Sequence, residues 1–115
     1  MKAEDLQLVE LTEAILKSKL SVEQVGKLEP ARMSLLRLRV KLGRELVELR
    51  ERMRMPNYKP DPKDKDTPRY TDFDRNIMLA AACAEAEADY ELVKGLEQLV
   101  KERIEVIKWI GGNHD

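Results

Sequence analysis

The stretch that decides the fold is TDFDRNIMLAAACAEAEADYELVKGLEQLVKERIEVIKWI, residues 71–110. It contains no proline, and its apolar residues recur at the three- and four-residue spacing of a helix face. Thr71 and Asp74 match a capping box at its start, because the threonine can accept from a backbone N–H while the aspartate reaches back. Gly111 and Gly112 follow its end, where glycine commonly stops a helix. We therefore predict one long helix over residues 71–110.

The two halves of this predicted helix carry different apolar faces. Small residues line one side of the first half, so a second helix can approach it closely. The second half has an apolar stripe that is wider than a two-helix contact needs, so it should meet more than one neighbour, within the chain or in an oligomer. The face of the first half comprises Ile77, Ala81, Ala84 and Ala88. The residues assigned to packing or oligomer contacts are Leu92, Leu96, Leu99, Ile104 and Ile107.

Two more helices are predicted in the first half of the chain. Residues 3–19 have apolar side chains at helical spacing, with acidic residues early and lysines late, as the helix dipole favours. Residues 30–54 carry leucines at spacings of three and four. This second helix is expected to begin at Pro30, because proline suits the first helical turn.

A short helical turn is predicted between these two helices. Ser21 and Gln24 have the spacing of a second capping box, whose side chains satisfy backbone N–H groups at a helix start. We expect this turn to run through Val25 and to be broken by Gly26.

Residues 55–70 are predicted to form a proline-rich loop. Proline interrupts helices and the interior of sheets, and this stretch contains Pro56, Pro60, Pro62 and Pro68. A connection of this length within a compact domain is either functional or disordered. The loop joins two helices of a single helical domain, which we expect to include residues 1–115.

The helix lengths predict how these elements pack. At 1.5 Å per residue, residues 71–110 extend about 60 Å and residues 30–54 about 37 Å. The two should run antiparallel, with the leucines of the shorter helix over the alanines of the longer one. About 22 Å of the longer helix then remains uncovered, and the helix at residues 3–19 has the right length to cover it. The predicted fold is all-α: an elongated antiparallel helical hairpin with an additional N-terminal helix, which favours oligomerisation because a short chain buries little surface.

The composition fits an exposed helical protein of a reducing compartment. Of the 115 residues, 43% are hydrophobic and 37% are charged, with a formal net charge of -1. A single cysteine excludes an internal disulfide, so Cys83 is expected to be a small core residue. Residues 1–20 mix acidic side chains with apolar ones, unlike a secretory signal, and no apolar run approaches the ~20 residues that span a bilayer. We expect a soluble, cytoplasmic chain.

Charge is distributed unevenly along the sequence. Residues 30–54 contain eight basic and three acidic side chains, whereas residues 71–110 contain nine acidic and five basic ones. Two interpretations remain open. In the first, the two helices neutralise each other; in the second, the basic residues contact phosphates while nearby aromatic rings stack on unpaired bases. The candidate nucleic-acid-binding residues are Arg37, Arg44, Arg50, Arg52, Arg54, Lys59, Tyr58 and Tyr70.

Catalytic and metal-binding groups are sparse. With one Cys and one His, the chain cannot assemble a thiolate–imidazole zinc site, and His114 lies in the C-terminal tail. Carboxylates at alternate positions from Glu85 to Glu91 point to different sides of a helix. A weaker alternative is a metal-dependent enzyme in which Glu87 and Glu91 converge with carboxylates of the preceding helix. We expect a non-enzymatic protein with no metal and no cofactor.

The chain also resembles a known family. A basic helix, a linker ending in Arg69-Tyr70-Thr71 and a long helix closing with LEQLVKERIEVIK, residues 96–108, are similar to the phage recombination mediators of the UvsY type. Members of that family are small helical proteins that oligomerise, bind single-stranded DNA and help load a RecA-like recombinase. The resemblance implies an oligomeric DNA-binding accessory protein of DNA recombination, located in the host cytoplasm.

Two functional hypotheses follow. The first is a non-enzymatic, oligomeric helical accessory protein that binds single-stranded nucleic acid. The second is a small protein-interaction module, an inhibitor or adaptor of host machinery, that presents the proline loop and the acidic helix face to a protein partner. Binding to oligonucleotides at two salt concentrations separates them, because phosphate contacts weaken steeply with salt.

Overall fold

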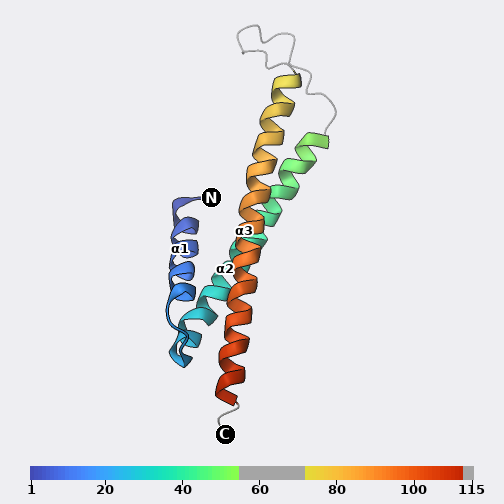
Figure 1. Ribbon diagram of the computed structural model, residues 1–115. Coiled ribbons are helices and arrows are strands. Elements are labelled where there is room, and N and C mark those ends of the chain that lie inside the picture. The colour runs from blue at the N-terminus through green and yellow to red at the C-terminus, as the bar shows by residue number, and fades with distance from the viewer. Residues whose placement is uncertain (55–71, 113–115) are drawn as a thin grey trace.

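The computed structural model describes residues 1–54 and 72–112, and every element in these ranges is helical (Figure 1). The all-α class predicted from the sequence is therefore confirmed for the described residues. The predicted loop at 55–70 and the predicted cap residue Thr71 lie outside them. The elements are α1 (Ala3–Lys17), the 3-10 turn η1 (Val22–Gln24), α2 (Val25–Arg54) and α3 (Asp72–Gly112).

α3 is the longest element and runs without interruption from Asp72 to Gly112. Its 41 residues correspond to roughly 60 Å of helix at 1.5 Å per residue. The two glycines expected to follow this helix form its last two residues instead. The molecule is correspondingly elongated, with principal extents of 76 × 23 × 17 Å.

α2 begins earlier than the sequence predicts. It starts at Val25, so the expectations that Gly26 breaks a short turn and that Pro30 begins the helix were both wrong. Pro30 lies inside α2, where its missing N–H removes the hydrogen bond to the carbonyl of Gly26. Both residues are exposed, so water can satisfy that carbonyl. Exposure to water therefore lowers the cost of the lost hydrogen bond, and the helix continues through Pro30.

The capping box predicted at Ser21 and Gln24 was also wrong. Ser21 makes no side-chain capping hydrogen bond, and Gln24 is buried. The Gln24 amide instead lies 2.9 Å from the carbonyl of Lys19 and 3.1 Å from that of Ile15. It therefore ties the end of α1 to the start of α2. α1 ends at Lys17, slightly before the predicted boundary.

α2 and α3 lie side by side and run in opposite directions. At one end Lys108 Nζ lies 3.0 Å from Glu29 Oε1, and at the other Arg50 Nη2 lies 3.7 Å from Glu87 Oε2. Figure 1 shows the two helices crossing, with α3 in front of α2. The core that they form together with α1 is aliphatic. It comprises Val9, Leu28, Leu35, Leu38, Leu42, Val93, Leu96, Val100, Ile104 and Ile107.

The alanine face of α3 is not where α2 packs. Ala81, Ala84 and Ala88 are exposed, so the prediction that leucines of the shorter helix cover them was wrong. Because α2 starts at Val25, its 30 residues reach about 45 Å and extend over the half of α3 that has the wide stripe. Larger aliphatic side chains bury more apolar area per contact, which favours that pairing.

α1 lies against the middle of α3 and beside α2. The ammonium group of Met1 is 3.0 Å from Asp89 Oδ2, and Arg103 Nη2 donates to the carbonyl of Leu16 at 2.7 Å. These two contacts show that α1 and α3 run in the same direction. α1 therefore covers part of the wide-stripe half of α3, but alongside α2 rather than beyond its end.

Cys83 is not a core residue. Its side chain is half-buried, and Sγ lies 3.3 Å from Met53 Sδ near the end of α2. The expectation of a small core residue was therefore wrong, because α2 has almost ended where it meets this part of α3.

Candidate functional site

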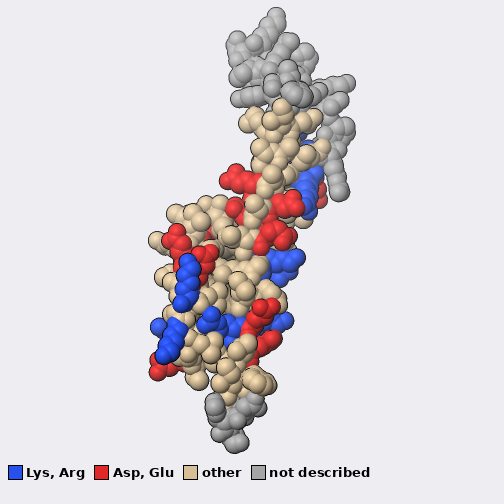
Figure 2. Space-filling model, viewed as in Figure 1, with Lys and Arg blue, Asp and Glu red and all other residues tan. Residues whose placement is uncertain are grey.

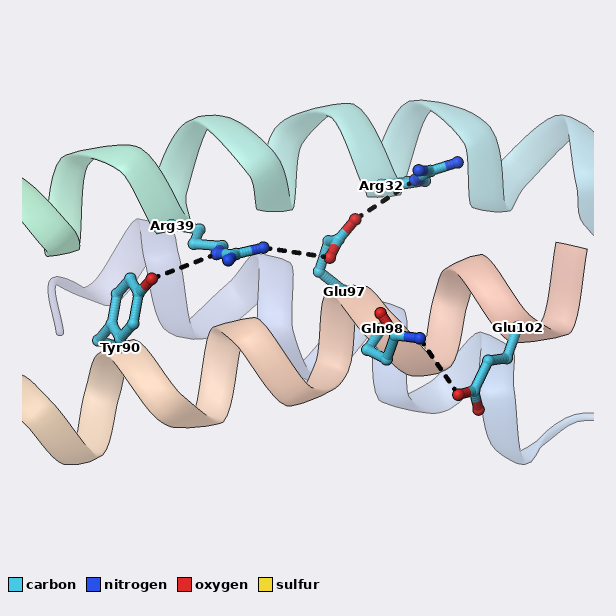
Figure 3. Close-up of polar contacts among 6 residues, drawn as sticks. All are labelled: Arg32, Arg39, Tyr90, Glu97, Gln98 and Glu102. Carbon is cyan, nitrogen blue, oxygen red and sulfur yellow. Dashed lines mark hydrogen bonds and ion pairs between the residues drawn. The ribbon is translucent and has the colours of Figure 1, made fainter.

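A buried carboxylate links α2 and α3. The Glu97 side chain is 6% exposed, and it accepts from Arg32 Nε at 3.4 Å and lies 3.7 Å from Arg39 Nη1 (Figure 3). The two arginines are seven residues apart on α2 and therefore share a helix face. A buried charge is tolerated when it is paired in this way. This cluster holds the two helices in register.

Tyr90 extends the same cluster by two turns of α3. Arg39 Nε donates to Tyr90 Oη at 3.5 Å, and the guanidinium carbon lies 5.9 Å from the ring centroid (Figure 3). The hydrogen bond with Tyr90 is the main cause that raises the pKa of Arg39 above its usual value. Gly43 lies beside the ring, and a Cβ there would be 3.4 Å from Tyr90, at the limit of ordinary van der Waals contact.

The predicted nucleic-acid-binding residues fall into three groups. Arg50 is paired with Glu87 across the helices. Arg37, Arg44 and Arg52 are exposed and have no carboxylate partner within the described ranges. Arg54 ends α2, but its side chain is outside the description, as are Lys59, Tyr58 and Tyr70. Together with Arg32 and Arg39, the pairing of Arg50 shows that part of the opposite charge of α2 and α3 is neutralised between them.

The acidic residues of α3 do not gather around one point. Glu87 is engaged by Arg50, and Asp89 is engaged by the Met1 ammonium group. The hydrogen bond to Asp89 is the main cause that raises the pKa of that ammonium group. Over residues 1–54 and 72–112, no group of three or more His, Cys, Asp or Glu side chains has an arrangement that would hold a metal ion.

The outer face of α2 carries an apolar stripe that the sequence prediction missed. Met33, Val40 and Val47 lie at seven-residue intervals and are 53–54% exposed. Arg37 and Arg44 lie within the same turns on this side of the helix. We call the three apolar residues the α2 stripe. The seven-residue recurrence was visible in the sequence, but the stronger leucine pattern beside it obscured it.

α3 carries a second exposed apolar stripe, which consists of Leu92, Leu99 and Val106. These residues are 47–54% exposed and again lie at seven-residue intervals. The set predicted for packing or oligomer contacts is therefore divided between core and surface. Leu96, Ile104 and Ile107 are buried in the core, whereas Leu92 and Leu99 belong to this α3 stripe.

An apolar groove borders the α3 stripe on the side of α1. Leu16 and Leu20 form one wall, and Leu99, Arg103 and Val106 form the other. Leu20 is also well exposed. Exposed apolar surface of this kind, bordered by charged side chains, is typical of sites that bind another protein.

Comparison with known proteins identified no relative of this chain. No family model matches the chain, and neither the curated proteins nor the solved structures contain a match. Among the described helices, none combines the length and apolar character required to cross a bilayer.

Proposed function

We propose that this chain is a non-enzymatic, oligomeric helical scaffold that binds helices of other protein molecules. In this proposal α2 and α3 form an antiparallel hairpin, with α1 as an additional N-terminal helix. The observation that carries the proposal is the α2 stripe, whose three side chains remain about half exposed on a helix that is otherwise well packed. The partner would be a protein, as for an inhibitor or adaptor of cellular machinery.

The spacing of the α2 stripe supports helix docking. A helix that docks in a groove or against another helix makes contact through residues at i, i+3, i+4 and i+7. Met33, Val40 and Val47 follow the seven-residue spacing of such a contact. Full burial of such a side chain contributes about 1.5–3 kcal/mol, so covering the exposed half of each contributes about 1 kcal/mol. Arg37 and Arg44 beside the stripe would orient an acidic partner helix.

The buried cluster around Glu97 gives the α2 stripe a rigid base. Arg32 and Arg39 hold α2 on α3 through the buried Glu97 carboxylate, so α2 does not have to reorganise when a partner binds. A pre-organised surface loses less conformational entropy on binding.

Affinity capture followed by reconstitution tests the proposal. The bait proteins are the wild type, Val40→Lys with a charge in the α2 stripe, and Gln7→Lys with the same charge on the exposed side of α1. We expect a partner that binds the wild type and Gln7→Lys but not Val40→Lys, and that binds again when both proteins are purified. If no protein follows this pattern in both steps, the α2 stripe is not a partner site.

A second candidate is binding of single-stranded nucleic acid, the activity that the resemblance to recombination mediators implies. The observation in its favour is that Arg37, Arg44 and Arg52 are exposed without a carboxylate partner within the described ranges. We expect the affinity for a labelled oligonucleotide to fall with salt, with a slope of about 0.7 for each phosphate contact. Fluorescence anisotropy of the wild type and of the triple variant Arg37→Ala/Arg44→Ala/Arg52→Ala checks this, and absence of binding at low salt excludes it.

A further inference from the structure

The exposed side of α3 carries a regular heptad pattern over most of its length. One row of the pattern has mostly large residues, and the other has small ones towards its centre. The large row is Met78, Glu85, Leu92, Leu99 and Val106, and the small row is Ala81, Ala88, Gly95, Glu102 and Trp109. All ten residues are exposed. We call these two rows the α3 seam.

Neither α1 nor α2 covers the α3 seam. α2 packs on the side of α3 that presents Val93, Val100 and Ile104, and α1 contacts the side that presents Asp89 and Arg103. Figure 1 shows α3 in front, with α2 passing behind it and α1 to one side. In Figure 2 the upper part of α3 presents uncharged surface, whereas charged side chains gather around the middle of the molecule. The seam is therefore open to another molecule.

We infer that a second copy of this chain occupies the α3 seam, with the two α3 helices antiparallel about a two-fold axis between Leu92 and Gly95. This inference rests on the proposed scaffold function and names one of its partners. In a two-fold interface residue i of one copy meets residue j of the other, and j meets i. The register brings large residues against small ones: Leu92 against Gly95, Leu99 against Ala88 and Val106 against Ala81.

The ends of the α3 seam also become covered in this register. Met78 of one copy meets Trp109 of the other, and these side chains are 60% and 69% exposed in the single chain. The first turns of α3, which extend beyond the contact with α2, thereby gain an apolar neighbour. The groove between Leu20 and Val106 lies beside the alanine-rich segment of the second copy, whose small side chains can approach it closely.

A parallel pairing would fit the same seam poorly. It would place Leu92 against Leu92 of the second copy and Gly95 against Gly95 of the second copy. Layers of large side chains would then alternate with layers that leave a gap. Large layers would hold the helices apart, and each glycine or alanine layer would leave a cavity that costs stability. The antiparallel register avoids both problems because every large apolar residue faces a small one or Trp109.

Charges at the seam favour and oppose the pairing in different places. Glu91 and Lys94 border the centre of the seam and are exposed, so each can reach the opposite charge on the second copy. The layer that opposes pairing brings Glu85 against Glu102 of the other copy. Gln98 Nε2 donates to Glu102 Oε1 at 3.3 Å but leaves the charge in place (Figure 3). Replacing Glu102 by Gln should therefore tighten the dimer.

The size of the seam indicates a weak dimer. From Met78 to Trp109 the seam is about 46 Å long, and a contact strip about 10 Å wide covers about 460 Å² on each copy. The total of about 900 Å² is at the lower end of specific interfaces. We therefore expect dissociation constants in the micromolar range rather than an obligate dimer.

Sedimentation velocity over a range of protein concentrations tests the α3 seam. The two matched variants are Leu99→Lys in the seam and Val40→Lys in the α2 stripe, because both residues are 54% exposed and neither belongs to the core. We expect the wild type and Val40→Lys to dimerise as concentration rises, and Leu99→Lys to stay monomeric with unchanged helical circular dichroism. Val106→Lys provides a second seam variant if Leu99→Lys loses helicity.

The opposite results overturn the inference in distinguishable ways. A wild type that stays monomeric throughout the concentration range excludes the dimer, while the α2 stripe can still bind a different protein. A dimer that Val40→Lys dissociates and Leu99→Lys does not places self-association on the α2 stripe, so the scaffold function stands and the seam is wrong.

Disulfide trapping tests the antiparallel register. In a Cys83→Ala background, Ala88→Cys and Leu99→Cys are prepared separately, oxidised alone and oxidised after mixing. Because Ala88 faces Leu99 of the other copy, we expect a disulfide-linked dimer chiefly in the mixture. Efficient trapping of Leu99→Cys with itself indicates parallel helices and overturns the proposed register.

Discussion

Arg39 and Glu97 form an ion pair across the α2–α3 contact, with 3.7 Å between Nη1 and Oε2. Glu97 is buried, whereas the arginine side chain is 34% exposed. The two partners therefore differ in what their removal would leave behind. The Arg39 guanidinium can be hydrated when Glu97 is removed. The Glu97 carboxylate, in contrast, would stay in the helix interface without a counter-charge when its arginines are removed.

Removal of both arginines should destabilise the protein more than removal of the carboxylate. Arg32→Ala/Arg39→Ala leaves Glu97 buried and unpaired, and we expect a loss of about 2–3 kcal/mol because the partly exposed pair is weaker than a fully buried one. Glu97→Leu should cost less than half of that. Urea unfolding followed by circular dichroism measures both, and equal losses would show that Glu97 gains little from its partners.

Two glycines of α2 should respond differently to alanine. A Cβ at Gly26 meets nothing within 4 Å, so Gly26→Ala should stabilise the protein by about 0.5–1 kcal/mol through helix propensity. At Gly43 the same Cβ lies 3.4 Å from Tyr90, so Gly43→Ala should gain less. Gly43→Val should displace the ring and be destabilising. Thermal unfolding of the three variants compares them, and a stabilising Gly43→Val would contradict the close approach of Tyr90.

Gln24 should control how firmly α1 is held. Arg103 Nη1 donates to Gln24 Oε1 at 3.2 Å. The amide nitrogen of Gln24 in turn donates to the carbonyl of Ile15 near the end of α1. Gln24→Ala removes a buried hydrogen-bonding group and should cost about 1–3 kcal/mol. Hydrogen exchange should accelerate over residues 3–17 more than over α2. Uniform acceleration would show that the effect is global instead.

Trp109 provides an internal reporter of the α3 seam. It is the single tryptophan of the chain and is 69% exposed. When Met78 of a second copy covers it, its emission should shift to shorter wavelength as protein concentration rises. Leu99→Lys should remove this concentration dependence, and an unchanged spectrum over the range in which dimers sediment would show that Trp109 lies outside the interface.

The sequence was sufficient to predict which segments are helical. Apolar residues every three or four positions from Leu35 to Met53, and again along residues 71–110, depend only on the geometry of the helix itself. The same local information was misleading near Gly26, whose entropic cost is outweighed by the packing of the rest of α2, and near Pro30, whose cost depends in part on whether the carbonyl that it leaves unpaired is exposed to water. That exposure is a property of the surrounding structure.

The tertiary structure decided which face of each helix is covered. The sequence determined that α3 has an alanine face and a wide aliphatic stripe, but not which of the two α2 packs against. α2 packs on Val93, Val100 and Ile104, since these bury more apolar surface than Ala81 or Ala88 does, and Glu97 sets the register. The candidate interaction sites are the apolar faces that remain exposed after α2 has packed on α3. A helical sequence pattern specifies the faces of its own helix but not which neighbour covers each face.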